Sequence, residues 1–173
     1  MNQQFEQIRA EFQHRVYSYA WYSLRIAADA EDIAQEAFIR LWQNWAQVDL
    51  QQVGGWLMRV THNLVIDHVR RQKSRPRTTE QELDELPATA QDDHQDTLRT
   101  IVEQSISQVK EPYRTTLIMR EIQGLPYQDI ADVLEISLEQ VKTDLFRGRR
   151  KLREQVKLHP LYCSDLLHEG HES

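Results

Sequence analysis

The sequence has little glycine or proline and no excess of positive charge. Only five of its 173 residues are glycine and five are proline, and apolar residues recur with helical spacing, so we expect an all-α protein. Lys and Arg total 21 against 27 Asp and Glu, which gives a formal net charge of -6. Composition alone therefore argues against a nucleic-acid-binding protein, because such proteins are expected to be basic.

Cysteine and long apolar runs are also scarce. A single cysteine, Cys163, excludes an internal disulfide and favours a reducing, cytoplasmic location. No apolar stretch approaches the roughly 20 residues that cross a bilayer, so no membrane insertion is expected. The polar start, Met1 to Arg9, lacks the pattern of a secretory signal.

The negative charge is concentrated in one middle segment and in the tail. Residues 1–78 carry 10 basic and 8 acidic side chains, and residues 112–158 carry 9 and 7. Residues 79–111 carry 2 and 9, and residues 159–173 carry 0 and 3. Two mildly positive helical modules are therefore expected around a flexible acidic linker. In chain order, the predicted parts are residues 1–77, the linker 78–97, residues 98–158 and a tail, 159–173.

A first amphipathic helix is predicted from Asp29, as its N-cap, to Trp45. Its apolar stripe predicts core positions, namely Ile33, Ala34, Ala37, Phe38, Leu41, Trp42 and Trp45. The opposite face carries Asp32, Gln35, Glu36 and Arg40. On the pattern alone, such a charged face is simply solvated.

A further helix is predicted from Trp56 to about Gln72. It places Trp56, Arg59 and Asn63 on one face, a trio suited to stacking on unpaired bases and hydrogen-bonding to their edges. The simpler alternative is that Trp56 belongs to the core. Five cations lie between Arg70 and Arg77, where they would neutralise phosphates or complement the helix C-terminus.

The stretch from Leu125 to Glu154 has the pattern of a helix-turn-helix. A short helix ends near Leu134, Glu135 and Ile136 form a tight turn, and Ser137 caps a cation-rich helix with a capping box at Gln140. The second helix would enter the major groove by its N-terminal end. The expected base-reading residues are Ser137, Glu139, Gln140 and Thr143, and the expected phosphate contacts are Lys142, Arg147, Arg149, Arg150 and Arg153.

The tail contains four possible metal ligands, His159, Cys163, His168 and His171. Zn(II) or Cu(I) is conceivable there, but the spacing matches no standard finger and short tails are usually plain. We therefore predict no metal and no cofactor. No phosphate-binding glycine loop, metalloprotease motif or activated nucleophile is visible, so no enzyme is predicted.

Three blocks together resemble the extracytoplasmic function (ECF) group of sigma factors in the sigma-70 family. They are DAEDIAQEAFIRLW from Asp29, GWLMRVTHNLVIDHVRR from Gly55, and the segment from Glu111 to Glu154. The resemblance implies a promoter-specific initiation factor that binds core RNA polymerase and promoter DNA. A dedicated anti-sigma factor is also implied as a partner.

The resemblance also implies roles for particular residues. Asp32, Gln35, Glu36 and Arg40 would contact the clamp helices of the polymerase beta-prime subunit. The helix-turn-helix would read the minus-35 element and touch the beta flap. The residues that would melt and read the minus-10 element are Trp56, Arg59, Asn63, Asp67, Arg70 and Arg71.

Two positions depart from the family pattern. Glu135 stands where glycine is usual in the turn, and a non-glycine residue at positive φ would cost about 1 kcal/mol. Gly148 stands where alanine is common, which weakens the helix by about 1 kcal/mol but allows close packing. Two alternatives stay open: a stand-alone helix-turn-helix regulator, and a metal- or redox-responsive regulator acting through the tail.

Overall fold

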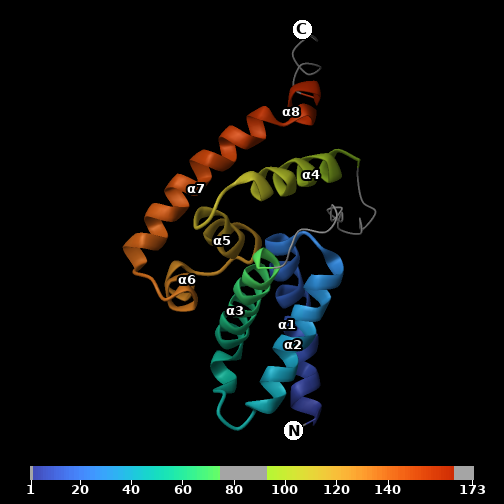
Figure 1. The fold of residues 1–173 in the computed structure, drawn as a ribbon, viewed down its shortest axis with the longest axis vertical. Coiled ribbons are helices and arrows are strands. Elements are labelled where there is room, and N and C mark those ends of the chain that lie inside the picture. The colour runs from blue at the N-terminus through green and yellow to red at the C-terminus, as the bar shows by residue number, and fades with distance from the viewer. Residues whose placement is uncertain (1, 75–92, 166–173) are drawn as a thin grey trace. The chain divides into compact units, whose positions relative to one another are not determined.

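The computed structural model describes residues 2–74 and 93–165, and every regular element in those ranges is a helix (Figure 1). The all-α prediction is confirmed. The chain divides into two compact units, Met1–Leu86 with Gln128–Glu135, and Pro87–Tyr127 with Ile136–Ser173. In chain order the helices are α1 (Asn2–Leu24), α2 (Ala27–Gln43), η1 (Leu50–Gln52), α3 (Val53–Lys73), α4 (Asp93–Gln108), α5 (Tyr113–Leu117), η2 (Ile118–Ile122), α6 (Tyr127–Leu134), α7 (Leu138–Leu158) and α8 (Pro160–Asp165).

Helices α1, α2 and α3 pack side by side in the first unit (Figure 1). Fully buried large side chains from all three helices form the core, among them Trp21, Leu41 and Leu57. The buried Tyr19 hydroxyl forms a hydrogen bond of 2.8 Å with Nδ1 of His62, which joins α1 to α3. Burial of these apolar surfaces supplies most of the stabilisation of the bundle.

The start of α2 differs from the prediction. The N-cap lies three residues earlier, at Ile26, and Asp29 is in the first turn. Asp29 is not a cap, because its carboxylate lies 3.0 Å from Nε2 of His68 on α3. The carboxylate of Asp29, predicted to cap α2, therefore pairs instead with His68 on α3.

The apolar stripe of α2 is buried as predicted except at its C-terminal end. Trp42 is 42% exposed and Trp45 is partly exposed, so the prediction of two core tryptophans was wrong. Both rings pack edge-on against Phe5 of α1, at centroid distances of 5.1 and 5.8 Å.

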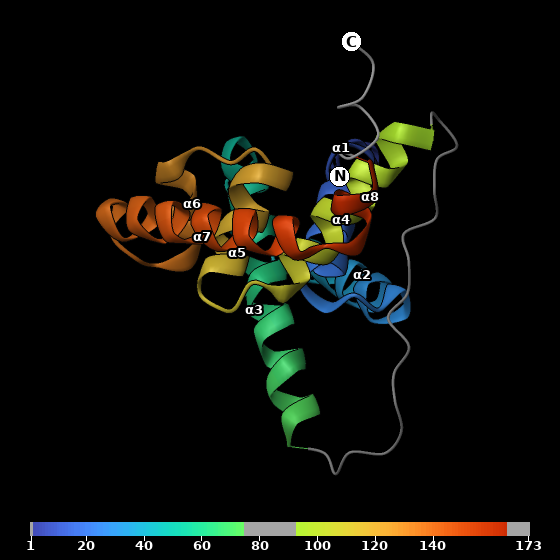
Figure 2. The ribbon, with the colours of Figure 1, turned by 90° about the horizontal axis from the view of Figure 1, so that it is seen from above.

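The second unit is built on α7, along which α4, α5 and α8 pack (Figures 1 and 2). Leu117, Ile118, Val141 and Leu145 are among its buried residues. A Cβ added at Gly148 would lie 3.1 Å from Cγ of Leu117. The predicted close packing at Gly148 is therefore confirmed, and α7 approaches α5 closely because that residue has no side chain.

The order helix, turn, helix is present between residues 127 and 158. Helix α6 ends at Leu134, Glu135 adopts a φ of 56°, and Ser137 caps α7 by accepting a hydrogen bond of 3.1 Å from the backbone N–H of Gln140. The capping box is only half formed, because the Gln140 side chain binds Asp144 instead of returning to Ser137.

Replacing Glu135 with glycine is expected to raise the free energy of unfolding by about 1 kcal/mol, because glycine adopts positive φ without steric cost. Urea denaturation of the full chain measures the change. Glu135→Ala is the matched control: it removes the carboxylate but keeps Cβ, and should give no such gain. Equal stability of the glycine and alanine variants would contradict the account.

Candidate functional site

The predicted minus-10 residues share one face of α3. Arg59, Asn63 and Arg70 are exposed, and Trp56 and Asp67 are partly buried. Trp56 is therefore neither a core residue nor fully solvated, so part of its ring is available for stacking. Its neighbours on the same face supply a guanidinium and an amide, the groups that bind base edges.

The C-terminal end of α3 is strongly basic. Its last turn contains Arg70, Arg71 and Lys73, and all three side chains are exposed. Two carboxylates lie near this turn: Oδ1 of Asp67 is 3.9 Å from Nη1 of Arg70, and Asp29 accepts a hydrogen bond of 3.2 Å from Gln72. Most of this positive charge therefore faces solvent, where phosphates are accessible to it.

The predicted polymerase-binding residues lie together on α2. Asp32 and Gln35 are exposed, and Glu36 accepts a hydrogen bond of 2.9 Å from Nε of Arg40. The pair is about 40% exposed, which makes it a surface ion pair of the kind that contributes little to stability. Its charges remain accessible to a partner.

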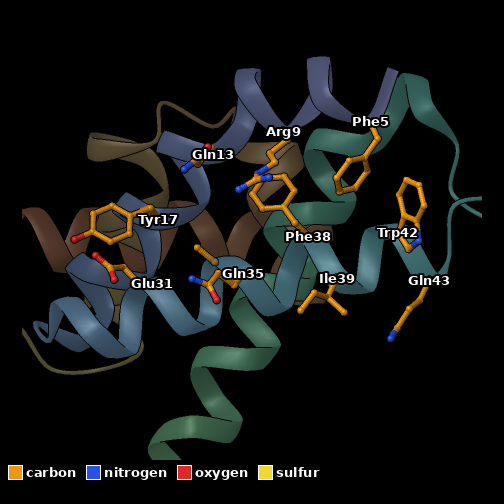
Figure 3. A pocket seen from close by; sticks show the side chains of 11 residues that line it. Phe5, Arg9, Gln13, Tyr17, Glu31, Gln35, Phe38, Ile39, Trp42 and Gln43 are labelled. Atoms are coloured by element: carbon orange, nitrogen blue, oxygen red, sulfur yellow. The ribbon is translucent and has the colours of Figure 1, made fainter. Parts of the chain in front are cut away.

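A groove of about 700 Å³ separates α1 from α2 beside these residues (Figure 3). Gln35 lies on its α2 side with Ile39, which is 49% exposed, and Trp42. The α1 side was missed by sequence reasoning: it consists of Phe5, Arg9, Gln13 and Tyr17. The sequence contains the pattern that could have identified this face, because residues spaced four apart lie on one side of a helix.

All nine residues predicted for minus-35 recognition are exposed on α7 or at its N-cap. They are Ser137, Glu139, Gln140, Lys142, Thr143, Arg147, Arg149, Arg150 and Arg153. Sequence reasoning left Phe146 out of this set, although the ring is 69% exposed in the middle of it. An exposed apolar ring among cations is a feature that contact with a base or sugar would cover.

Several of these cations already have acidic partners. Nζ of Lys142 lies 2.8 Å from Glu139. Arg149 donates two hydrogen bonds, of 2.9 and 2.7 Å, to one carboxylate oxygen of Glu121. The hydrogen bonds to Glu121, and then one to Tyr127, raise the pKa of Arg149 above its ordinary value. The Arg149 side chain is thus fixed beside η2 without a loss of charge.

In the tail, the structure places only His159 of the four possible metal ligands. Its Nε2 lies 2.6 Å from Oε1 of Gln104, and its Nδ1 accepts a hydrogen bond of 3.2 Å from the backbone of Leu161. The Cys163 side chain, His168 and His171 lie outside the described residues, as do residues 78–92 of the predicted linker. Helix α4 begins at Asp93, within the segment predicted as linker. Among the described residues, no cluster of His, Cys, Asp and Glu could hold a metal.

Comparison with known proteins matches both halves of the chain to one family. Residues 8–75 match Sigma-70 region 2, and residues 99–152 match Sigma-70, region 4. The ECF RNA polymerase sigma factor SigW of Bacillus subtilis is 30% identical over 161 residues, covering 84% of this chain and 85% of SigW. SigE of Mycolicibacterium smegmatis is 31% identical over 150 residues, covering 84% of this chain but only 58% of SigE.

Solved structures show the same fold. The sigma factor RpoE of Bartonella quintana, in complex with the anti-sigma factor NepR, gives a TM-score of 0.73 at 19% identity, covering 88% of this chain and 96% of RpoE. CnrH, in complex with the cytosolic domain of CnrY, gives 0.67 at 19% identity, covering 89% of this chain and 88% of CnrH. The fold and the two matched regions define a sigma-70-type transcription factor. Because the chain is 30% identical to SigW and 31% identical to SigE, it belongs to the ECF group of that family.

None of the described helices is both long and apolar enough to cross a membrane.

Proposed function

We propose that the chain binds core RNA polymerase and directs it to promoters, with three separate surfaces for the three tasks. Each predicted part has one role. Residues 1–77 bind polymerase and open the minus-10 element, and residues 98–158 read the minus-35 element. Residues 78–97 link these two parts. The protein acts in the cytoplasm without catalysis or a cofactor of its own. An anti-sigma factor is its expected inhibitor, since RpoE forms a complex with the anti-sigma factor NepR and CnrH forms one with the cytosolic domain of CnrY.

The polymerase-binding surface is the exposed face of α2, with the beta-prime clamp helices as its partner. Asp32 and Gln35 stand free for polar contacts on this face, and the Glu36–Arg40 pair adds both signs of charge. The groove beside it offers Ile39 and Trp42, exposed apolar side chains that an approaching helix would cover. This combination of an apolar centre and a charged rim is typical of protein interfaces.

The minus-10 surface is the face of α3 that carries Trp56, Arg59 and Asn63. An aromatic ring stacks on any base once the duplex is open, and the amide and guanidinium bind base edges. Arg70 and Arg71 follow on the same helix, where they hold the phosphates of the strand. Asp67 lies between the two groups as a further minus-10 candidate, with Oδ1 3.9 Å from Nη1 of Arg70.

The minus-35 surface is the N-terminal half of α7. Ser137 caps the N-terminus of α7, which begins at Leu138. Glu139, Gln140 and Thr143 lie in the first turns of this capped helix, where they would enter the major groove. Lys142, Arg147, Arg149 and Arg150 then bind phosphates, as cations on a recognition helix do. The exposure of all nine predicted residues on one capped helix is the observation that carries the proposal.

Run-off transcription with purified chain and core polymerase tests the proposed function. We expect transcripts that start at defined promoters when both components are present, and none from core polymerase alone. A stand-alone regulator gives the opposite result, with tight binding to duplex DNA in the absence of polymerase and no initiation in its presence. That outcome would overturn the sigma-factor role.

A further inference from the structure

The side chain of Gln140 is held by a neighbour that faces the interior of the protein. Its Nε2 donates a hydrogen bond of 2.8 Å to Oδ1 of Asp144, one helical turn further on. Its backbone N–H donates to the capping oxygen of Ser137 at 3.1 Å. Both the backbone and the side chain of Gln140 are therefore fixed before any DNA arrives.

Asp144 is unusual among the charged residues of α7 because it is only 2% exposed. The neighbouring Val141 and Leu145 are buried on the same side of the helix. From this position the carboxylate does not reach a DNA base itself. A buried carboxylate is costly unless it is hydrogen-bonded, and the Gln140 amide supplies such a bond.

The chemistry of the pair fixes which end of the Gln140 amide faces Asp144. A carboxylate accepts hydrogen bonds and donates none, so the amide must turn its NH₂ group toward it. One of the two N–H protons is then used. The carbonyl oxygen and one remaining N–H are left for a ligand at the surface.

These two remaining groups match adenine in the major groove. Adenine presents an N6 donor and an N7 acceptor, which pair with the amide oxygen and its free N–H. Guanine presents two acceptors, O6 and N7, and needs two donated protons. A free glutamine can offer both protons of its NH₂ group, whereas one held by Asp144 cannot.

We propose that Asp144 is a positioning residue that makes Gln140 select adenine over guanine at one base pair of the minus-35 element. The proposal rests on the proposed function of α7 and adds the specificity of one of its readers. Asp144 acts through Gln140 and does not touch DNA.

The test uses holoenzyme assembled from core polymerase and the full chain, with promoter fragments whose minus-35 element is randomised. Sequencing the bound fragments gives the ratio of adenine to guanine at each position. For the wild type we expect one position with a ratio of about 10, the discrimination that a bidentate contact provides. Gln140→Ala should bring the ratio at that position close to one, which identifies it as the Gln140 position.

Asp144→Leu removes the acceptor and suits the apolar surroundings. We expect it to lower the adenine-to-guanine ratio about fivefold at the Gln140 position and to leave the ratios elsewhere unchanged. Asp144→Asn should have a smaller effect, because its amide can still accept from Gln140 in one of two orientations. In a Gln140→Ala background, Asp144→Leu should have no further effect on that ratio, since the coupled partner is gone.

Two outcomes would overturn the proposal while the sigma-factor function stands. One is a wild-type ratio at the Gln140 position in Asp144→Leu. The other is an equal loss of selectivity at every position, which indicates that Asp144 only supports the fold of α7. A holoenzyme that selects no promoter sequence at all overturns the proposed function instead, and this inference with it.

Discussion

Trp56→Ala is expected to reduce run-off transcription from duplex promoters at least fivefold. Stacking of one base on an aromatic ring contributes about 1–3 kcal/mol, which corresponds to a factor of roughly 5 to 150. Trp56 is partly exposed on the face of α3 shared with Arg59 and Asn63, so it would contact a base that has left the duplex. Binding to core polymerase should be unchanged, because the α2 face is not altered.

Two controls separate stacking from folding in this experiment. Trp45→Ala removes another partly exposed tryptophan, one that packs against Phe5 and lies off the α3 face, and should keep transcription near the wild-type level. A template with an unpaired minus-10 segment should recover part of the loss in Trp56→Ala, because the strands no longer have to be separated. Wild-type transcription from duplex DNA by Trp56→Ala would show that the ring does not take part in opening.

Gly148→Leu is expected to lower the free energy of unfolding by about 3 kcal/mol, at the upper end of typical overpacking costs. Even the first carbon of the new side chain would lie 3.1 Å from Cγ of Leu117 and 3.4 Å from Cβ of Tyr113. Leu117 is fully buried and has little room to move. Thermal and urea denaturation of the full chain would measure the loss, together with weaker binding to minus-35 DNA.

Smaller substitutions at glycines make matched controls. Gly148→Ala should leave stability nearly unchanged, because a gain of about 1 kcal/mol in helix propensity opposes the tight contact with Leu117. Gly55→Ala lies in α3 with nothing within 4 Å of the new Cβ, so it should give the propensity gain alone. If Gly148→Leu were as stable as Gly55→Ala, the close approach of α5 and α7 could not be correct.

Local patterns predicted the helices, the turn and the exposed face of α7 well, because each depends on neighbouring residues. Helical spacing located the buried stripe of α2, and the Ser137 signal located the start of α7. The positive φ at Glu135 was expected from the resemblance, in which glycine is usual at this position of the turn. In each case the determining contacts lie within a few positions along the chain.

The features that sequence reasoning missed depend on contacts between distant residues. The carboxylate of Asp29 does not cap α2 but contacts His68, 39 positions away. Arg149 binds Glu121, 28 positions away. Trp42 is 42% exposed and its ring packs against Phe5 of α1, 37 positions away, a contact that no local pattern specifies. The bond from Gln140 to Asp144 was accessible in principle, since a spacing of four places the two side chains together.

The acidic partners along α7 change how the binding of DNA by this helix should respond to salt. Each cation that replaces solvent ions on a phosphate normally releases about one condensed counterion, and this release makes affinity fall with ionic strength. Arg149 and Lys142 already lie within 2.8 Å of the carboxylates of Glu121 and Glu139, so on reaching a phosphate each would exchange a carboxylate partner for a phosphate. The number of basic residues on α7 therefore overstates its salt sensitivity. If α7 binds DNA as proposed, we expect its affinity for random duplexes to be weak and its binding to depend more on base contacts.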